Sequence, residues 1–384
     1  MERYKLQNFD DIRPVHDSEV TNVISGLLKD VSFRRAVEPL VAPLTWEMFS
    51  GAMMSCKTIY EFQRNIIYPF MKQIIAKTTD GVSAVGIDNL KKEESYLFIS
   101  NHRDIVLDAA LLNIMFFDND RNTSEIAIGD NLLIYPWITD LVRLNKSFIV
   151  KRKVSIREML ATSKQLSEYI YDTINRRNQS IWLAQREGRS KDSDDRTQGS
   201  LLKMLTLYDR TEPLKALQAL NIVPLALSYE YDPCDYLKAK EFQQKRDNPE
   251  HVKSQSDDIE NMRTGITGYK GKVVFSFGNP INEKLEETTD NVEKSDVLSF
   301  VSKSIDTEIF RSYYFFPINW VAYDMMMGTI NHSDKYSDSD VENFNSYLDR
   351  QIDKIDLPNK DYNFLRGKII EMYGNTVKNQ LSVK

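Results

Sequence analysis

The sequence predicts an α/β fold in which a mixed, largely parallel sheet is flanked by helices on both faces, with helical N-terminal and C-terminal extensions. Short β-like runs alternate with amphipathic helical stretches between residues 95 and 278. Helical periodicity dominates the residues before and after this block. The 384 residues include only 14 glycines and 12 prolines, which argues against repeat arrays and many-turned β-barrels.

These patterns divide the chain into three parts. We expect N-terminal amphipathic helices in residues 1–81, an α/β domain in residues 82–283 and a helical region in residues 284–384. In the first part, apolar residues recur at helical spacing over residues 17–31 and 59–75. Pro69 has no N–H to donate, so it is expected to kink or restart the second of these helices.

The expected elements of the other two parts follow the same periodicities. Strands are predicted at residues 95–100, 124–129, 147–151, 180–185, 221–229 and 272–278. Helices are predicted at residues 104–117, 132–143, 154–176, 197–208, 211–219, 293–310, 319–328, 339–354 and 360–378. The highly charged residues 238–263 are expected to form an excursion on the surface. Sheets of this kind bind ligands where a strand ends and the next helix begins, so the strand ends are where we expect chemistry.

Composition and charge narrow the class of protein. The net charge of −6 argues against a nucleic-acid binder that works through bulk positive charge. Cys56 and Cys234 provide neither a disulfide framework nor a metal-ligand pair, and the charged N-terminus has no apolar signal segment, so a cytoplasmic location is expected. No run is apolar enough to span a membrane. Residues 143–157 carry six basic side chains and no acidic one, which suggests either a specific anionic partner or a solvated basic face.

His102 is the first candidate for chemistry, because it lies between an apolar strand and an apolar helix. A histidine beside a carboxylate is the minimal equipment for activating a hydroxyl by general-base catalysis. Asp108 can reach it only if His102 occupies the turn, since positions six apart on one helix lie ~120° apart. Asp104 could take the partner role instead, or could cap the helix in a purely structural arrangement.

Basic and turn-forming residues end the next strands. Lys151 and Arg152 end one strand. At least one of the two side chains should project from the strand end, where it could bind a phosphate or carboxylate. Glu187-Gly188-Arg189 follows the next, where Gly188 permits a tight turn and the two charged residues could fix each other and an anion, or form only a surface ion pair. A flexible polar segment, residues 191–197, is expected to come after them.

The last of these strands contains Pro224, which is expected at the start of the strand or at a sheet edge. Together with the three strand ends above, the apolar run around Pro224 completes a series of four blocks in a fixed order.

In this order the four blocks resemble the glycerolipid acyltransferase family, which includes glycerol-3-phosphate and 1-acylglycerol-3-phosphate acyltransferases. Residues 102–108 resemble its His, four residues, Asp signature, although five residues separate His102 from Asp108 here. GDNLL followed by SFIVKR resembles the Phe and Arg motif, and IVPLALSYEY resembles the fourth motif. EGRS lacks the residue that usually precedes the Arg, which leaves Arg189 as the best match and Arg186 as a substitute.

The resemblance implies a role in phospholipid biosynthesis, with an acyl group passing from acyl-CoA or acyl-carrier protein to a hydroxyl of glycerol 3-phosphate or its 1-acyl derivative. It implies that His102 is the general base and that Asp108 holds it. Lys151, Arg152, Glu187, Gly188 and Arg189 would bind the acceptor's phosphate. The resemblance implies no metal and no cofactor besides the acyl thioester co-substrate.

Three alternatives remain open from the sequence. The acceptor could be another lyso-lipid. A metal-dependent phosphoester hydrolase could use His102, Asp104, Asp108 and Asp130, since carboxylate and histidine clusters suit such metals. A non-catalytic lipid-binding protein could share the fold. The 59–75 helix or the aromatic residues 312–323 could make peripheral contact with the inner face of the cell membrane. Apolar stripes of this kind more often form part of an ordinary core.

Overall fold

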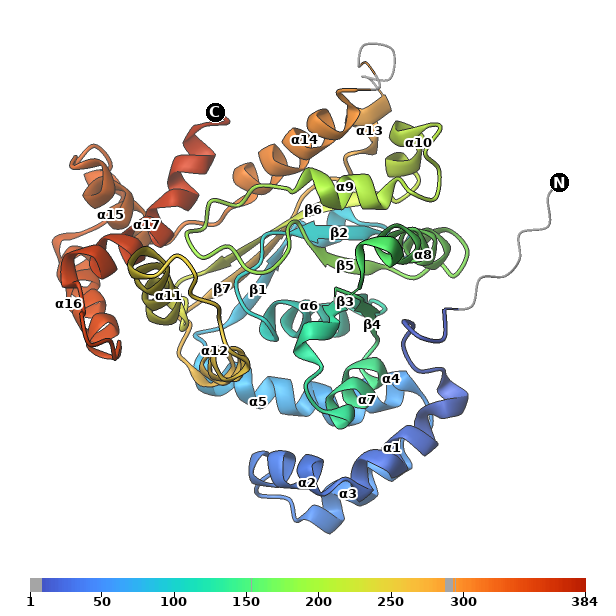
Figure 1. Cartoon of the computed structure of the whole chain (residues 1–384). Helices are drawn as coiled ribbons and strands as arrows, with labels where there is room; N and C mark the ends of the chain where they lie inside the picture. Colours follow the sequence, from blue (N-terminus) through green and yellow to red (C-terminus); the bar gives the residue numbers. More distant parts are fainter. Residues whose placement is uncertain (1–8, 153, 287–292, 294) are drawn as a thin grey trace.

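The computed structural model of the chain describes residues 9–152, 154–286, 293 and 295–384. Within them lies one seven-stranded sheet in the order β1-β7-β6-β2-β5-β3-β4 (Figure 1). Its strands are β1 (Val82–Val85), β2 (Leu97–Ser100), β3 (Glu125–Gly129), β4 (Ser147–Val150), β5 (Ile181–Ala184), β6 (Ile222–Tyr229) and β7 (Val273–Phe277). Neighbouring strands are parallel except β6 and β7. The predicted mixed, largely parallel sheet is confirmed, and the six predicted runs are β2 to β7.

Strand β1, which was not predicted from the sequence, pairs with β7 at the edge of the sheet. Its four residues alternate between half-buried and exposed. So short a run, with Ser83 and Ala84 at its centre, carries little apolar periodicity, and its pairing with β7 decides its conformation.

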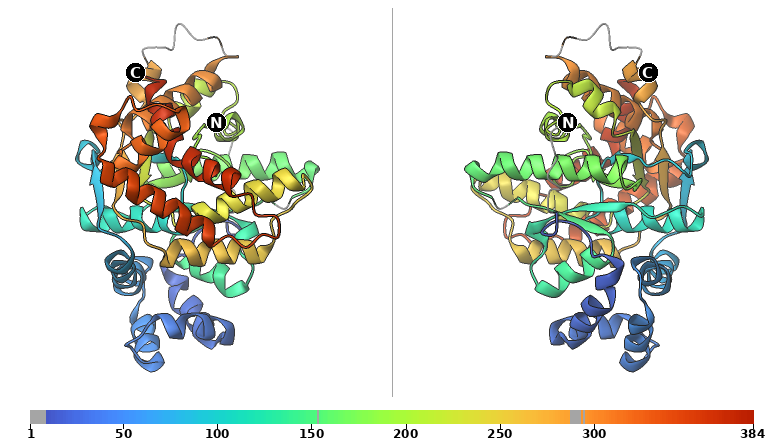
Figure 2. Two further views of the ribbon diagram at one scale, coloured as in Figure 1. Left: turned by 90° about the vertical axis from the view of Figure 1, so that its left-hand side faces the viewer. Right: turned by 90° about the vertical axis from the view of Figure 1, so that its right-hand side faces the viewer.

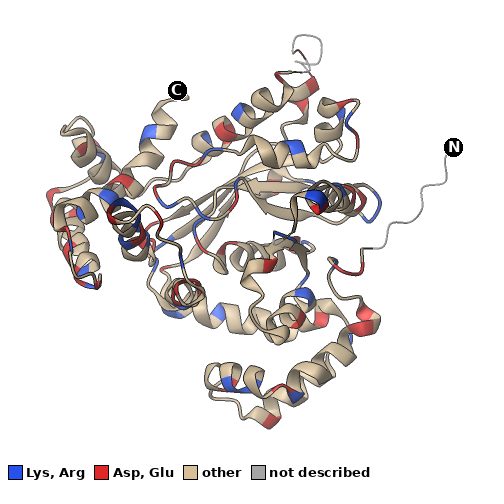
Figure 3. Cartoon of the chain, viewed as in Figure 1, with Lys and Arg blue, Asp and Glu red and all other residues tan. Residues whose placement is uncertain are grey.

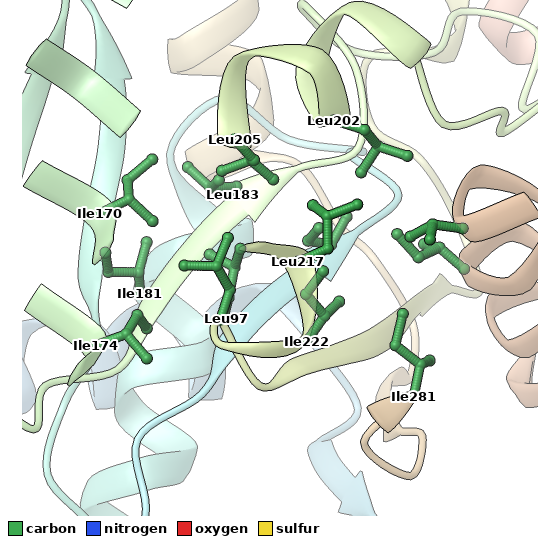
Figure 4. Close-up of a cluster of buried hydrophobic side chains, with 14 of the residues drawn as sticks. Leu97, Ile170, Ile174, Ile181, Leu183, Leu202, Leu205, Leu217, Ile222 and Ile281 are labelled. Carbon is green, nitrogen blue, oxygen red and sulfur yellow. The ribbon is translucent and has the colours of Figure 1, made fainter. Parts of the chain in front are cut away.

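Helices cover both faces of the sheet, as predicted. Successive residues of a strand point to opposite faces, so Leu97 and Ile99 face one side and Phe98 the other. The first side packs against α8 (Ile156–Asn175), α9 (Gly199–Leu205), α10 (Pro213–Gln218) and α14 (Val297–Ser312), as Figure 4 shows in part. The second packs against α5 (Tyr68–Thr78) and α6 (Leu107–Asp118). Full burial of each such leucine, isoleucine or phenylalanine stabilises the fold by roughly 1.5–3 kcal/mol.

The N-terminal helices form a smaller core of their own. They are α1 (Val20–Lys29), α2 (Val31–Val37), α3 (Trp46–Ser55) and α4 (Ile59–Phe62), and they contact α7 (Pro136–Leu144) through Leu144. Figure 2 places them at one end of the molecule. Helices α2 and α3 were not predicted from the sequence, although Asp30 and Thr45 accept hydrogen bonds from the first-turn N–H groups as N-caps.

Pro69 coincides with a change of helix type, as predicted. Residues Gln63–Ile67 form a π-helical turn between α4 and α5, in which the Tyr68 N–H donates to the Gln63 carbonyl. A proline ring clashes with the carbonyl four residues earlier in an α-helix, and the wider turn relieves that clash. This stretch packs against the sheet and the N-terminal core, with Phe62 fully buried and Met71 nearly so.

The segment at residues 238–263, predicted to be an excursion on the surface, is exposed at most residues from 245 to 260 but begins inside the protein. Two helices, α11 (Asp235–Asp247) and α12 (Gln255–Thr267), occupy this stretch. In α11, Asp235, Lys238 and Glu241 are buried, whereas Lys245, Arg246 and Asp247 are exposed. Two of the buried charges find partners inside the protein: Lys238 pairs with Asp232, and Glu241 pairs with Lys191. The charge at the start of this segment therefore reflects internal ion pairs, whereas most of the charge farther along is exposed to solvent.

The C-terminal region is helical, as predicted. Its helices are α13 (Asn282–Glu286), α14, α15 (Pro317–Met327), α16 (Asp338–Asp353) and α17 (Tyr362–Leu381), and the last three share a core with Ala239 of α11. Tyr313, Phe316 and Ile318 of the aromatic run are at most 6% exposed, so these residues serve the interior. In the part of the chain that the structure describes, no helix is long and apolar enough to cross a membrane.

Pro224 lies inside a central strand, which corrects the expectation that it would be at a strand start or sheet edge. It is the third residue of β6, between β2 and β7. The antiparallel pairing with β7 begins one residue later, at Leu225 and Phe277. The Pro224 carbonyl accepts a hydrogen bond from the Gly278 N–H at 2.9 Å, beyond the end of β7. The missing N–H of Pro224 is tolerated because this residue lies just outside the β6–β7 pairing, which begins at Leu225.

Candidate active site

The candidate residues lie where four neighbouring parallel strands end. In the sheet order β2-β5-β3-β4, His102 follows β2, Asp130 follows β3, Arg152 follows β4 and Glu187 follows β5. The carboxyl ends of parallel strands share one edge of the sheet, so four segments that are distant in sequence meet there.

His102 lies in the turn between β2 and α6, which is the position that its contact with Asp108 requires. Asp108 is the second residue of α6, and its Oδ2 lies 2.7 Å from Nδ1 of His102. The histidine side chain is 13% exposed and the aspartate is fully buried. The ring also meets the edge of Trp182, with 5.5 Å between the ring centroids.

Asp108 is held by more than the histidine. Its Oδ2 also accepts the backbone N–H of Arg103 at 2.6 Å and of Asp104 at 3.0 Å, while Oδ1 accepts the Tyr229 hydroxyl at 2.8 Å. A carboxylate only accepts hydrogen bonds, so with a neutral imidazole Nδ1–H donates and Nε2 keeps its lone pair. That arrangement is suited to removing a proton from a hydroxyl.

Asp104 caps the helix and does not contact the histidine. Its Oδ1 accepts the N–H groups of Val106 at 2.8 Å and Leu107 at 2.7 Å at the start of α6. Burial raises the pKa of Asp104, and the nearby Asp108 raises it further. Of the two partners left open by the sequence, Asp108 is the one that the structure brings to His102.

The structure brings Arg152 and Glu187 together and leaves Lys151 apart from them. Nη1 of Arg152 lies 3.1 Å from Oε1 of Glu187, and the Arg152 N–H donates to Asp130 at 3.1 Å. Lys151 turns the other way and pairs with Asp11 in the N-terminal segment. Neighbouring residues at a strand end point to opposite sides, which explains the separation.

Glu187 and Arg189 do not fix each other, contrary to the expectation. Gly188 between them has φ +69°, a left-handed conformation that favours glycine, and the turn it makes separates the two side chains. Arg189 donates instead from Nη2 to the Asn261 Oδ1 of α12 at 2.9 Å. Its Nη1 is buried without a hydrogen-bond partner among the described residues.

Residues 191–197 are held in place rather than flexible. Asp195 is fully buried, and the N–H of Thr197 donates to Asp306 of α14 at 2.8 Å. Asn375 of α17 donates to the carbonyl of Asp192 at 2.8 Å. The polar composition suggested a solvated loop, but its polar groups bind to the C-terminal helices, which the sequence could not place.

The four residues proposed for a metal site do not converge on one point. Asp104 faces the start of α6, and Asp130 accepts the Arg152 N–H. Across residues 9–152, 154–286, 293 and 295–384, no three histidine, cysteine, aspartate or glutamate side chains group closely enough to hold a metal ion.

Residues 81–205 match the family model described as Acyltransferase. No curated protein matches the sequence. Among solved structures, a similar one is that of the 1-acyl-sn-glycerophosphate (LPA) acyltransferase PlsC from Thermotoga maritima, with 10% identity and a TM-score of 0.38 over 78% of this chain and 97% of that chain.

The segment that matches the family model, residues 81–205, holds every site residue that the sequence predicted, but partners from outside it complete their surroundings. Tyr229 ends β6, Asn261 belongs to α12, and Lys238 of α11 donates to the Arg103 carbonyl at 3.3 Å. The sequence offered a signal only for Tyr229, a hydroxyl at the end of an apolar strand. Lys270 lies close enough to Asp104 for the two charges to interact, and burial lowers the pKa of Lys270 to about 8.

Proposed function

We propose that the protein transfers a fatty acyl group from acyl-CoA or acyl-carrier protein to a hydroxyl of glycerol 3-phosphate or 1-acylglycerol 3-phosphate. The observation that carries the proposal is the 2.7 Å contact between His102 and Asp108 at the end of β2. It lies inside the segment that matches the acyltransferase family. The ordered strand-end motifs of the sequence support the choice of a glycerolipid acceptor.

In the proposed reaction, Nε2 of His102 takes the proton from the acceptor hydroxyl as its oxygen attacks the thioester carbonyl carbon. Asp108 keeps Nδ1 protonated and stabilises the imidazolium that forms. The tetrahedral intermediate collapses by breaking its C–S bond, and the imidazolium returns the proton to the departing thiolate sulfur. The products are an ester and a free thiol, and no acyl-enzyme is formed.

The acceptor's phosphate is proposed to bind at Arg152, Glu187, Gly188 and Arg189. Arg152 is 35% exposed on its side chain, so an anion can approach it, and Glu187 orients its guanidinium. Arg189 offers a guanidinium nitrogen that has no protein partner among the described residues. Lys151 would join this set only by leaving Asp11.

The rival prediction of a metal-dependent phosphoester hydrolase receives less support from the geometry. Among the described residues, the Asp108 carboxylate accepts hydrogen bonds from His102, Arg103, Asp104 and Tyr229. A metal-ligand role would require this carboxylate to give up those donors. The same contacts serve general-base catalysis without any rearrangement.

The test is an assay of thiol release and of product mass with purified protein, an acyl-CoA or acyl-carrier protein, and either glycerol 3-phosphate or its 1-acyl derivative. His102→Ala should lower the rate by ~10²- to 10⁴-fold, the usual contribution of a positioned general base, while thermal unfolding stays cooperative.

The matched control is His332→Ala, because His332 forms a second histidine–aspartate pair in the C-terminal region, with 2.9 Å to Asp324. It should lose nothing in rate. Turnover retained by His102→Ala, or no transfer by the unmodified protein to either acceptor, would overturn the proposal. Lipid binding without transfer would instead support the non-catalytic alternative.

A further inference from the structure

We infer that Asp195 and Tyr313 are positioning residues that hold the loop of the proposed general base through the side chain of Arg103. The inference rests on the proposed function of His102 and extends it to a residue outside the family-matched segment, Tyr313, which follows α14.

Arg103, Asp195 and Tyr313 form a buried chain of hydrogen bonds. Nη1 and Nη2 of Arg103 donate to the two carboxylate oxygens of Asp195 at 2.8 and 2.6 Å. The Tyr313 hydroxyl donates to Oδ2 of the same carboxylate. The Arg103 side chain is 7% exposed and that of Asp195 is fully buried. A two-point contact of this kind fixes the orientation of a guanidinium as well as its place.

Arg103 transmits this constraint to the base because it directly follows His102. Its backbone N–H donates to Oδ2 of Asp108 at 2.6 Å, the oxygen that also contacts His102. Its carbonyl accepts from Lys238 at 3.3 Å. The peptide groups on both sides of Arg103 are thus held while its side chain is locked, so the turn that carries the imidazole has little freedom.

The other end of the chain of hydrogen bonds is anchored in the C-terminal region. The Tyr314 N–H donates to Oγ of Ser228 in β6 at 3.1 Å, which places Tyr313 beside the sheet. Arg103 and Tyr313 also line a polar cavity of about 30 Å³, room for about one water molecule. The segment after α14 therefore packs directly behind the loop of the proposed base.

Stability alone is a poor explanation for such a group. Replacing a buried ion pair by apolar residues of similar volume is often neutral or stabilising, so burial of Arg103 and Asp195 does not by itself favour the fold. A similar trio, Arg177, Glu125 and Tyr169, lies at the opposite ends of the strands, with 2.9 Å between Arg177 and Glu125 and 2.5 Å between Tyr169 and Glu125. It offers a comparison with the same chemistry but without a neighbouring base.

The experiment compares Tyr313→Phe and Asp195→Asn with Tyr169→Phe and Glu125→Gln in the full chain. Each is assayed for kcat and KM with the acyl donor and acceptor that the unmodified protein uses, and each is melted. We expect Asp195→Asn to lower kcat by roughly 100-fold, the effect of a misplacement near 1 Å, and Tyr313→Phe by roughly 10-fold. KM for the acceptor should change by less than about 3-fold, because neither residue contacts the proposed phosphate site.

Tyr169→Phe and Glu125→Gln should lower the melting temperature about as much as Tyr313→Phe and Asp195→Asn do. Unlike those two variants, they should keep the kcat of the unmodified protein. An unchanged kcat in a folded Tyr313→Phe protein would overturn the inference, as would an equal loss of kcat in Tyr169→Phe. If Asp195→Asn fails to fold, Tyr313→Phe, which removes one oxygen atom, decides. A wild-type protein that transfers no acyl group contradicts the proposed function and the inference together, whereas an active wild-type protein with an unaffected Tyr313→Phe variant contradicts the inference alone.

Discussion

At the scale of single residues, the orientation of His102 depends on the way Asp108 is held. The carboxylate accepts hydrogen bonds from the imidazole, two backbone N–H groups and the Tyr229 hydroxyl. It also lies in the first turn of α6, where the helix dipole favours a negative charge. These contacts hold the carboxylate in one orientation. The carboxylate in turn fixes the orientation of His102, the proposed general base.

The same scale distinguishes Arg189 from the other cations of the site. Arg189→Lys keeps the charge but removes the second guanidinium nitrogen, which is the one without a protein partner among the described residues. If Arg189 binds the acceptor's phosphate, KM for a phosphorylated acceptor should rise by about 10- to 100-fold, matching ~1.5–3 kcal/mol for a hydrogen bond to a charged group. Steady-state kinetics with varied acceptor checks this.

The control for that measurement is Arg176→Lys, just beyond the end of α8 and far from the strand ends that carry the site. Its KM should match that of the unmodified protein. An unchanged KM in Arg189→Lys would favour an acceptor that lacks a phosphate.

At the scale of elements, α12 packs directly on the loop of the proposed base. A Cβ atom at Gly265 would lie 1.9 Å from Oδ2 and 2.9 Å from Cγ of Asp104, which is buried and caps α6. Neither partner can move freely, because α12 also binds Arg189 through Asn261. Only glycine allows this helix to approach so closely.

Gly265→Ala should therefore destabilise the protein by about 1–3 kcal/mol, the usual range for overpacking a well-packed interior. Chemical denaturation measures it. The control is Gly367→Ala in α17, where nothing lies within 4 Å of the added Cβ. There the free energy of unfolding should rise by roughly 0.5–1 kcal/mol, because glycine is the poorer residue inside a helix. Equal effects at the two glycines would contradict the packing argument.

Elements with strong local periodicity could be predicted from the sequence, and those decided by distant contacts could not. Strands β2 to β7 follow from apolar runs, and the helices between them from helical spacing. The short edge strand β1 depends on its pairing with β7. The charges of α11 indicate a solvated segment until their partners, Asp232 and Lys191, are known to lie beside them.

At the scale of the whole molecule, the candidate site illustrates the same limit. The sequence places His102, Arg152 and Glu187 just after strands and Asp108 at the start of the helix after β2, and the sheet topology then brings them to one edge. It gives no sign of Tyr313, which lies 118 residues from Asp195 along the chain. Figure 3 shows both acidic and basic residues in the N-terminal helices, around the sheet and in the C-terminal helices, so charge patterning could not single out the pairs that matter.

A second polar cluster joins the C-terminal helices to the rest of the protein through Asp235, the first residue of α11. Asp235 is fully buried and accepts hydrogen bonds from Tyr347 at 2.6 Å, Gln351 at 2.6 Å and Tyr373 at 2.9 Å. Burial raises the pKa of Asp235 to about 7, although the Tyr347 hydrogen bond lowers it, and the neighbouring Asp232 adds to the rise.

This cluster makes the stability of the whole protein depend on pH. The folded chain holds the Asp235 proton up to about pH 7, whereas an unfolded aspartate releases it near its ordinary pKa of 3.8. In that window the folded state binds more protons, so this contribution to stability is complete below pH 3.8 and is lost as the pH rises through 7.

Asp235→Asn removes the titration and keeps the shape, and the tyrosine hydroxyls can accept from its amide. The unfolding free energy of the unmodified protein relative to Asp235→Asn should therefore fall by about 2–3 kcal/mol between pH 5 and 8, at 1.36 kcal/mol per pKa unit. The control is Asp353→Asn, an exposed change on α16. The unfolding free energy of the unmodified protein relative to this variant should stay the same between pH 5 and 8. A difference for Asp235→Asn that rises with pH would mean that the folded protein holds Asp235 ionised.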